Sequence, residues 1–296
     1  ESIRNLDKAY TNFYKKRAEL PKFKSKKHCK LSFYSRYDKI YFKDNVVNLE
    51  KIGKVKYKSS YDIDLTKIFK FSNPHVSYNG RCWVLTLGIE TKIEEIKLTN
   101  EVIGIDLGIK DLAICSNNIV FRNINKTKVV KNLEKRLRRL QRRVSKKYDM
   151  NKKGGSYNKT SNIIKLEERI KKLYRKLNNI RQDYIHKSTT SIVKAKPCRV
   201  VMEDLNAKGM MKNKHLSKAI QQQKLYEFIR QMKYKCEWLG IKFVQVDRYY
   251  PSSKTCSCCG NIKGDLKLSD RTYICQECGL VIDRDLNASI NLANYR

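Results

Sequence analysis

The stretch that decides the fold runs from Ser253 to Leu292 and reads SKTCSCCGNIKGDLKLSDRTYICQECGLVIDRDLNASINL. It holds two Cys-x-x-Cys pairs, Cys256 with Cys259 and Cys275 with Cys278, separated by fifteen residues. Two such pairs can present four thiolates to a common centre, and Zn²⁺ accepts a closed tetrahedron of four sulfurs. The gap between the pairs falls in the spacing class of zinc ribbons. The sequence therefore predicts one structural Zn²⁺ site with every coordination position filled by protein.

Neighbouring residues bear on the ligand set of this site. Gly260 and Gly279 directly follow the two pairs, where we expect the chain to turn with a positive φ. Cys258 is a further thiol inside the first pair, and the ligand set could shift to include it. The competing interpretation is two disulfides or free core thiols. Ten cysteines in a chain without a recognisable export signal favour metal ligation in a reducing compartment.

Acidic residues follow the second cysteine pair and recur at two upstream places. The run DRD, from Asp283 to Asp285, is typical of a helix start. Asp106 lies inside the apolar run VIGIDL, and Glu203 ends the apolar run VVME. A carboxylate in a buried strand is costly unless it binds a cation or caps a helix. The residues alone leave both roles open for Asp106.

Three separated acids in an α/β context favour metal-assisted phosphodiester cleavage. That chemistry uses two divalent cations, and Mg²⁺ prefers the oxygens of carboxylates. We therefore expect Asp106, Glu203 and either Asp285 or Asp283 to bind Mg²⁺.

The predicted order of elements around these acids is a three-strand meander, a strand, a helix, a strand and a late acid-bearing helix, which is the layout of an RNase H/RuvC-like fold. The expected elements around the acids are strands near 102–106, 112–116, 119–121, 199–202 and 241–247, and helices over 217–239 and 284–294.

The charge of the chain indicates a polyanionic partner. The 296 residues include 65 Lys and Arg against 29 acids, a formal net charge of +36. An excess of this size points to nucleic acid, and the 18 tyrosines and nine phenylalanines could stack on unpaired bases. A merely solvated basic surface or an anionic membrane are the alternatives. No run of about 18 apolar residues is present, so we expect no membrane span.

A helical hairpin is predicted over 129–195, with its tip at 151–158. Apolar residues at helical spacing form one stripe on each arm. The first arm reads KRLRRLQRRVSKK and is almost free of acids. Because a solvated helix face usually mixes both charges, we interpret this arm as facing phosphates. The candidate nucleic-acid contacts are Lys135, Arg136, Arg138, Arg139, Arg142 and Arg143.

The N-terminal third has a different pattern. A helix is predicted over 1–19, ended by Pro21, and short runs rich in Tyr, Phe, Val and Ile alternate with polar residues further on. They predict a small antiparallel β-domain, expected to close as a barrel, which could be a nucleic-acid platform or a plain structural domain. The predicted division is a helical segment and basic loop at 1–30, the β-domain at 31–98, the nuclease domain at 99–252 with the hairpin at 129–195, the ribbon at 253–281 and a last nuclease segment at 282–296.

Four ordered segments resemble one known family. They read GIDLGIKDLA, VVMEDLN, SSKTCSCCG with CQECG, and DRDLNASINL. They are similar to the motifs of the TnpB family, also called OrfB, whose members are transposon-encoded RNA-guided nucleases similar to the type V CRISPR effectors. The resemblance implies that Asp106, Glu203 and Asp285 are the catalytic acids of a RuvC-like domain holding two Mg²⁺ ions. It also implies that the β-domain is wedge-like and that the hairpin is an insertion.

The resemblance further implies partners and a location. They are a guide RNA from the transposon end and target double-stranded DNA, met in the prokaryotic cytoplasm. Family members begin with a further wedge strand and a helical recognition segment, and because both are missing before Glu1 we expect the chain to be truncated at its N-terminus. The alternative interpretation is a catalytically inactive, decayed transposon protein that only binds nucleic acid.

Overall fold

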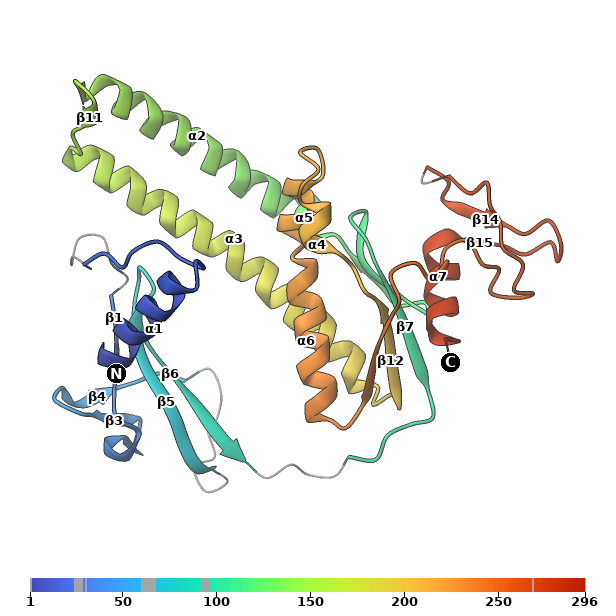
Figure 1. Ribbon diagram of the computed structural model, residues 1–296, viewed down its shortest axis with the longest axis horizontal. Helices are drawn as coiled ribbons and strands as arrows, with labels where there is room; N and C mark the ends of the chain where they lie inside the picture. Colours follow the sequence, from blue (N-terminus) through green and yellow to red (C-terminus); the bar gives the residue numbers. More distant parts are fainter. Residues whose placement is uncertain are drawn as a thin grey trace. The chain divides into compact units, whose positions relative to one another are not determined.

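The computed structural model describes residues 2–23, 29, 31–59, 68–91, 96–267 and 269–295 (Figure 1). The chain forms two compact units, Glu1–Ile93 and Glu94–Arg296, and each is described by itself. Within the described residues, none of the helices combines the length and the apolar character needed to span a lipid bilayer.

The described residues of the first unit form one α-helix, a 3₁₀ helix and two small antiparallel sheets. The first sheet has the order β1-β5-β6 and the second has the order β2-β3-β4. Ile40, Val47, Leu49 and Val76 form a small core in this unit. The elements are α1 (Ser2–Tyr14), β1 (Ser32–Tyr34), a 3₁₀ helix (Tyr37–Lys39), β2 (Tyr41–Lys43), β3 (Val46–Leu49), β4 (Gly53–Lys56), β5 (Ile68–Tyr78) and β6 (Trp83–Thr91).

Two expectations for this unit are wrong. The described strands form two separate three-stranded sheets instead of a barrel, because tight turns pair β2, β3 and β4 with their sequence neighbours while β1 pairs with the distant β5. Asp44 and Asn45, both at positive φ, close the tight turn between β2 and β3.

Helix α1 is shorter than expected, since it ends at Tyr14, well before Pro21. Lys16 adopts φ 54°, and the Arg17 amide donates back to the Asn12 carbonyl at 2.8 Å, which closes the helix end.

A five-stranded mixed sheet with the order β13-β12-β7-β8-β9 organises the second unit. Three strands form the antiparallel meander: β7 (Val102–Leu107), β8 (Asp111–Cys115) and β9 (Val120–Arg122). Strand β12 (Arg199–Glu203) pairs in parallel with β7, and β13 (Lys242–Val246) pairs in parallel with β12. The carboxyl ends of β7 and β12 therefore meet at one edge of the sheet.

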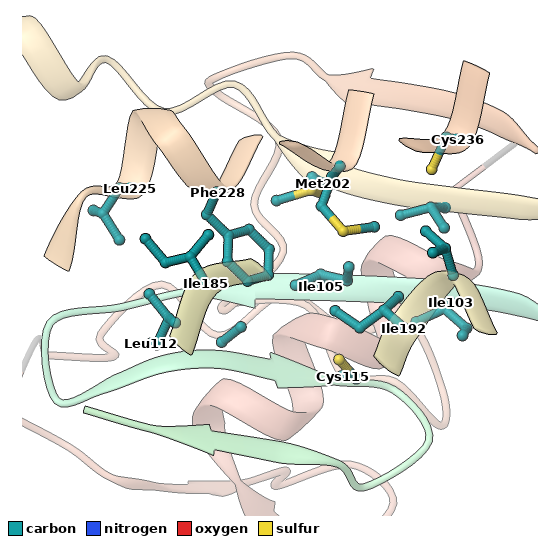
Figure 2. Packing of buried hydrophobic residues seen from close by; sticks show 14 of the residues in the cluster. Ile103, Ile105, Leu112, Cys115, Ile185, Ile192, Met202, Leu225, Phe228 and Cys236 are labelled. Atoms are coloured by element: carbon teal, nitrogen blue, oxygen red, sulfur yellow. The ribbon is translucent and has the colours of Figure 1, made fainter. Parts of the chain in front are cut away.

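Helices cover both faces of this sheet (Figure 1). On one face, α3 (Ser161–Lys194) and α6 (Leu225–Trp238) contribute Ile185, Ile192 and Phe228 to the main core, and Figure 2 shows them packed around Met202. On the other face, α7 (Arg284–Ala293) places Leu292 against Val201. Successive strand residues point to opposite faces, so neighbouring residues of β12 serve both cores.

The predicted helical hairpin is present. Helix α2 (Lys128–Met150) packs along α3 through a stripe of leucines, and the tip carries the short strands β10 (Lys152–Lys153) and β11 (Ser156–Tyr157). The buried residues of the hairpin stripe are Val130, Leu137, Leu140, Leu166, Leu173 and Leu177. The smaller helical elements of this unit are a 3₁₀ helix (Ile124–Lys126), α4 (Ala207–Met210) and α5 (Ser217–Gln223).

The single helix expected over 217–239 is two helices. Lys224 separates α5 from α6 and adopts the left-handed conformation, φ 55° and ψ 43°. Its Nζ donates to Asn178 Oδ1 at 2.6 Å and to Gln182 Oε1 at 3.1 Å, both on α3. These tertiary contacts fix a conformation that local helix propensity disfavours.

We predict that Gly104→Ala destabilises the second unit. A Cβ at this position in β7 would lie 2.0 Å from the Ser289 carbonyl oxygen and 2.4 Å from the Ala293 amide nitrogen, both backbone atoms of α7. Overpacking typically costs about 1–3 kcal/mol, and backbone atoms cannot yield as a side chain does. Urea unfolding should show a loss of at least about 2 kcal/mol.

Gly155→Ala is the matched control for this prediction. Nothing lies within 4 Å of a Cβ at Gly155, so its unfolding free energy should change by no more than about 0.5 kcal/mol. Equal stability of the two variants would contradict the close approach of α7 to β7.

Candidate functional site

Three carboxylates from distant parts of the sequence line one pocket of about 340 Å³. Asp106 comes from β7, Glu203 from the end of β12 and Asp285 from the first turn of α7. Strands β7 and β12 pair in parallel with Met202 opposite Ile105, so the residues that follow this pair are Glu203 and Asp106. The sheet register therefore brings the first two acids together, and α7 adds the third.

The structure places the two alternative third acids differently. Asp283 is exposed and is the N-cap of α7, where its Oδ1 accepts from the amides of Asp285 at 3.0 Å and Leu286 at 3.1 Å. Such a cap satisfies amides that the helix itself leaves without partners. Asp285 lies in the pocket with Asp106 and Glu203, whereas Asp283 does not line it.

Burial and, after it, the neighbouring carboxylates determine the electrostatics of Asp106 in this pocket. Burial raises the pKa of Asp106 well above its usual range, and the charges of Glu203 and Asp285 raise it further. Arg284 opposes the shift, and its Nη2 donates to Asp285 Oδ1 at 2.8 Å. The Nη1 of Arg271 lies 3.7 Å from Asp285 Oδ2. A cluster of this kind lowers its energy when cations approach it.

Several pocket residues were not predicted from sequence. The hydroxyl of Ser252, a buried side chain, donates to Glu203 Oε1. Lys110, Lys254 and Lys267 line the same pocket. Arg284 could have been noticed, since it stands between two acids in the run DRD. No local pattern marks Ser252, because its contact is made across 49 positions of sequence.

The four predicted cysteine ligands form a second cluster. Their Sγ atoms all lie within 4.8 Å of one another. Cys256 and Cys278 are 3.6 Å apart, as are Cys259 and Cys275. With Zn–S bonds of about 2.3 Å, the edge of a ZnS₄ tetrahedron is about 3.8 Å, so the spacing fits a single ion. Cys258 is exposed and lies outside this group.

The surroundings of the cysteines match a metal ribbon. Strands β14 (Thr272–Ile274) and β15 (Val281–Asp283) form a hairpin, and Tyr273 is buried beside the ligands. Gly260 and Gly279 have φ of 78° and 71°, which confirms the expected turns. In the described part of the chain, these cysteines are the only group of three or more potential ligands so closely set, and the acids are spaced more widely.

The six candidate nucleic-acid residues lie on α2, away from both clusters. All six are exposed, and none forms an ion pair with another described residue. The nearby acid Glu134 is engaged elsewhere, since it accepts from Arg181 Nη2 at 2.7 Å. The predicted basic face is therefore present, and the structure does not bring it into the acid pocket.

The order of the strands places the second unit among the α/β proteins. The acid pocket and the cysteine cluster give this unit two separate candidate metal sites. Comparison with known proteins identifies the family within this class. Residues 87–214 match the OrfB_IS605 family, described as "Probable transposase", and residues 226–292 match the Cas12f1-like TNB domain. Both matched segments lie mainly in the second unit.

Two relatives cover nearly the whole chain. A protein of Streptomyces pristinaespiralis named "Putative RNA-guided DNA endonuclease" is 31% identical over 294 residues, which are 99% of this chain and 69% of the relative. InsQ of Escherichia coli K12, which carries the same description, is 30% identical over 308 residues, 99% of this chain and 72% of the relative. The chain belongs to the TnpB/OrfB family of transposon-encoded proteins.

A solved structure supports the fold. The structure titled "Cryo-EM structure of CRISPR-Cas12f Ternary Complex" matches with a TM-score of 0.52 and 21% sequence identity. The match covers 76% of this chain and 46% of that one, so the chain spans about half the length of this neighbour. It shows a shared mixed α/β fold.

We predict that Asp106→Asn stabilises the metal-free protein at neutral pH. The folded-state pKa of Asp106 is raised above its usual value of 3.8, so the folded chain holds this proton more tightly than the unfolded chain. Stability from this group is therefore full below about pH 4 and falls as pH rises through the folded pKa. In EDTA, the variant should melt above the wild type at pH 7.5, and the difference should vanish near pH 4.

Glu168→Gln provides the control, because Glu168 is an exposed carboxylate on α3. Its thermal midpoint should follow the wild type at both pH values. A difference between Asp106→Asn and the wild type that is the same at pH 4 and pH 7.5 would contradict the raised pKa.

Proposed function

We propose that the protein is a Mg²⁺-dependent, RNA-guided DNA endonuclease encoded by an insertion sequence. The observation that carries the proposal is the convergence of Asp106, Glu203 and Asp285 on one pocket at the carboxyl ends of β7 and β12. The sheet order, with a meander followed by two parallel strands, supports an RNase H/RuvC-like domain. The names of the full-length relatives support RNA-guided DNA cleavage.

The pocket suits a hard divalent cation. Carboxylate oxygens are the protein ligands that Mg²⁺ prefers, and a cation among Asp106, Glu203 and Asp285 would hold all three ionised despite their mutual repulsion. A pair of such ions activates water and stabilises the leaving oxygen in phosphodiester hydrolysis. The chain itself holds Glu203 through Ser252, and Lys110 and Lys254 at the pocket offer charge to the phosphate backbone.

The cysteine cluster is proposed to hold one structural Zn²⁺. Four sulfurs fill a tetrahedral coordination sphere, so no open position remains for a substrate or water. In this proposal the ribbon is a fold element of the nuclease, and hydrolysis takes place at the acids.

The proposed partners are guide RNA from the transposon end and target double-stranded DNA. The exposed cations of α2 support them, because neutralising phosphates releases counterions and supplies most sequence-independent affinity. The two small sheets of the first unit are proposed as the wedge-like part of the family architecture.

One observation favours the alternative of a nucleic-acid-binding protein without cleavage. The carboxylate of Asp285 is engaged by Arg284 and lies near Arg271, which neutralise the third acid. This alternative predicts the same binding of nucleic acid and no Mg²⁺-dependent product.

Cleavage of labelled target DNA tests the proposal. The protein is purified together with RNA from its own locus and is assayed with Mg²⁺ and with EDTA. We expect Mg²⁺-dependent cutting that Asp106→Ala abolishes, while nucleic-acid affinity stays within about twofold because phosphate contacts dominate binding.

Asp283→Asn is a control for the third acid, since an amide oxygen can still cap α7. We expect it to retain cutting, whereas Asp285→Asn should lose it. Binding without cutting by the wild type would favour the non-cleaving alternative, and equal cutting by Asp106→Ala would overturn the site assignment.

Adjacent cysteines provide a sharp test of the zinc ligands. Cys259→Ser should lose bound zinc and loosen the ribbon, because a structural zinc site contributes folding free energy. Cys258→Ser should keep one zinc per chain, since this exposed thiol lies outside the cluster. Zinc content by elemental analysis checks both, and zinc loss in Cys258→Ser alone would mean that the ligand set is shifted.

A further inference from the structure

A short loop joins the acid pocket to the cysteine cluster. It follows β13 and leads into the first cysteine pair, so that only three residues separate Ser252 from Cys256. Ser252 is 2% exposed, and its hydroxyl donates to Glu203. Within four positions of sequence, the same loop therefore contacts a pocket carboxylate through the Ser252 side chain and carries a candidate zinc ligand.

Two buried asparagines of α7 form hydrogen bonds with the backbone of this loop. Asn291, 5% exposed, donates from Nδ2 to the Ser252 carbonyl at 2.7 Å and to the Thr255 carbonyl at 2.6 Å. Asn287 is fully buried and donates from Nδ2 to the same Thr255 carbonyl at 2.7 Å. Its Oδ1 accepts from the Ser257 amide at 3.0 Å. The contacts bracket Cys256 on both sides.

Helix α7, which forms these hydrogen bonds with the loop, also carries the third acid. Asp285 lies two residues before Asn287 and six before Asn291 on α7, and α7 packs directly on β7, the strand of Asp106. Buried networks in which the polar groups are satisfied are rigid, since breaking any bond leaves a desolvated group without a partner. A continuous set of hydrogen bonds therefore connects the segment that carries Cys256 to the elements that carry the carboxylates.

We propose that this loop couples the two metal sites, with Ser252 as the positioning residue that sets Glu203 according to the state of the zinc ribbon. The proposal rests on the proposed function, because it takes the acids as a divalent-cation site. Coupling between two sites is reciprocal. Zinc at the cysteines raises the affinity of the acids for a divalent cation, and the cation raises the affinity for zinc by the same factor.

Two binding measurements on the full chain test this coupling without relying on cleavage. Zinc affinity is measured by equilibrium competition with a chromogenic chelator, with and without saturating Mg²⁺. Mn²⁺ affinity, as a probe of the acids, is measured by electron paramagnetic resonance of the free ion, with and without zinc. In the wild type, we expect each metal to tighten the other by at least about fivefold.

The variants separate positioning from folding. Ser252→Ala should keep one zinc with an Mg²⁺-free affinity within about twofold of the wild type, while the effect of Mg²⁺ on that affinity disappears. Ser257→Ala is the matched control from the same loop. Its contact with Asn287 is made by the backbone amide, which the substitution keeps, so the coupling should persist.

The outcomes distinguish this inference from the proposed function. Mn²⁺ binding that Asp106→Ala removes, together with zinc affinity unchanged by Mg²⁺, would overturn the coupling and leave the nuclease site standing. Full coupling in Ser252→Ala would overturn the role of Ser252. Mn²⁺ binding that is absent, or equal in Asp106→Ala, would overturn the cation site and the coupling with it.

Discussion

Helix α7 lies against the backbone of β7 at Gly104, where no side chain fits between helix and strand. Much of the second unit follows from this approach. It seals the face of the sheet opposite α3 and α6, and it brings Asp285 to the strand that carries Asp106. It also sets Asn287 and Asn291 against the loop that enters the ribbon. Because backbone meets backbone, the position of the helix depends on the absence of a side chain at Gly104.

The acids illustrate how a fold can hold groups that repel one another. Strand pairing brings Asp106 next to Glu203, and the free-energy cost of burying Asp106, increased by the neighbouring charges, shows in its raised pKa. The main core, built from both sheet and helices, supplies the stability that offsets this cost. Functional sites commonly contain such locally unfavourable groups. The ribbon shows the same arrangement, since four thiolates are gathered where their sulfurs nearly touch.

Sequence reasoning succeeded where the signal was local. Residues close together in sequence were enough to predict three features: the cysteine cluster from its spacing, the hairpin from its apolar stripes, and the meander from its short apolar runs. It failed where tertiary contacts decide the conformation. The break at Lys224 depends on Asn178 and Gln182 of another helix, and the contact of Ser252 depends on a residue 49 positions away. In the first unit, the described strands pair as two separate sheets, with β1 against the distant β5, and do not close a barrel, since apolar alternation does not specify partners.

The length of α2 determines how far its row of cations extends. Its 23 residues rise about 1.5 Å each, so the helix measures about 35 Å. One turn of a double helix is also about 34–36 Å. The cations of α2 from Lys128 to Lys147 cover 19 of these steps, about 29 Å, so in the proposed function a helix lying along a duplex meets phosphates over most of one turn of its axis. Shortening the hairpin by two helical turns would reduce that reach by about 11 Å, or some three base pairs.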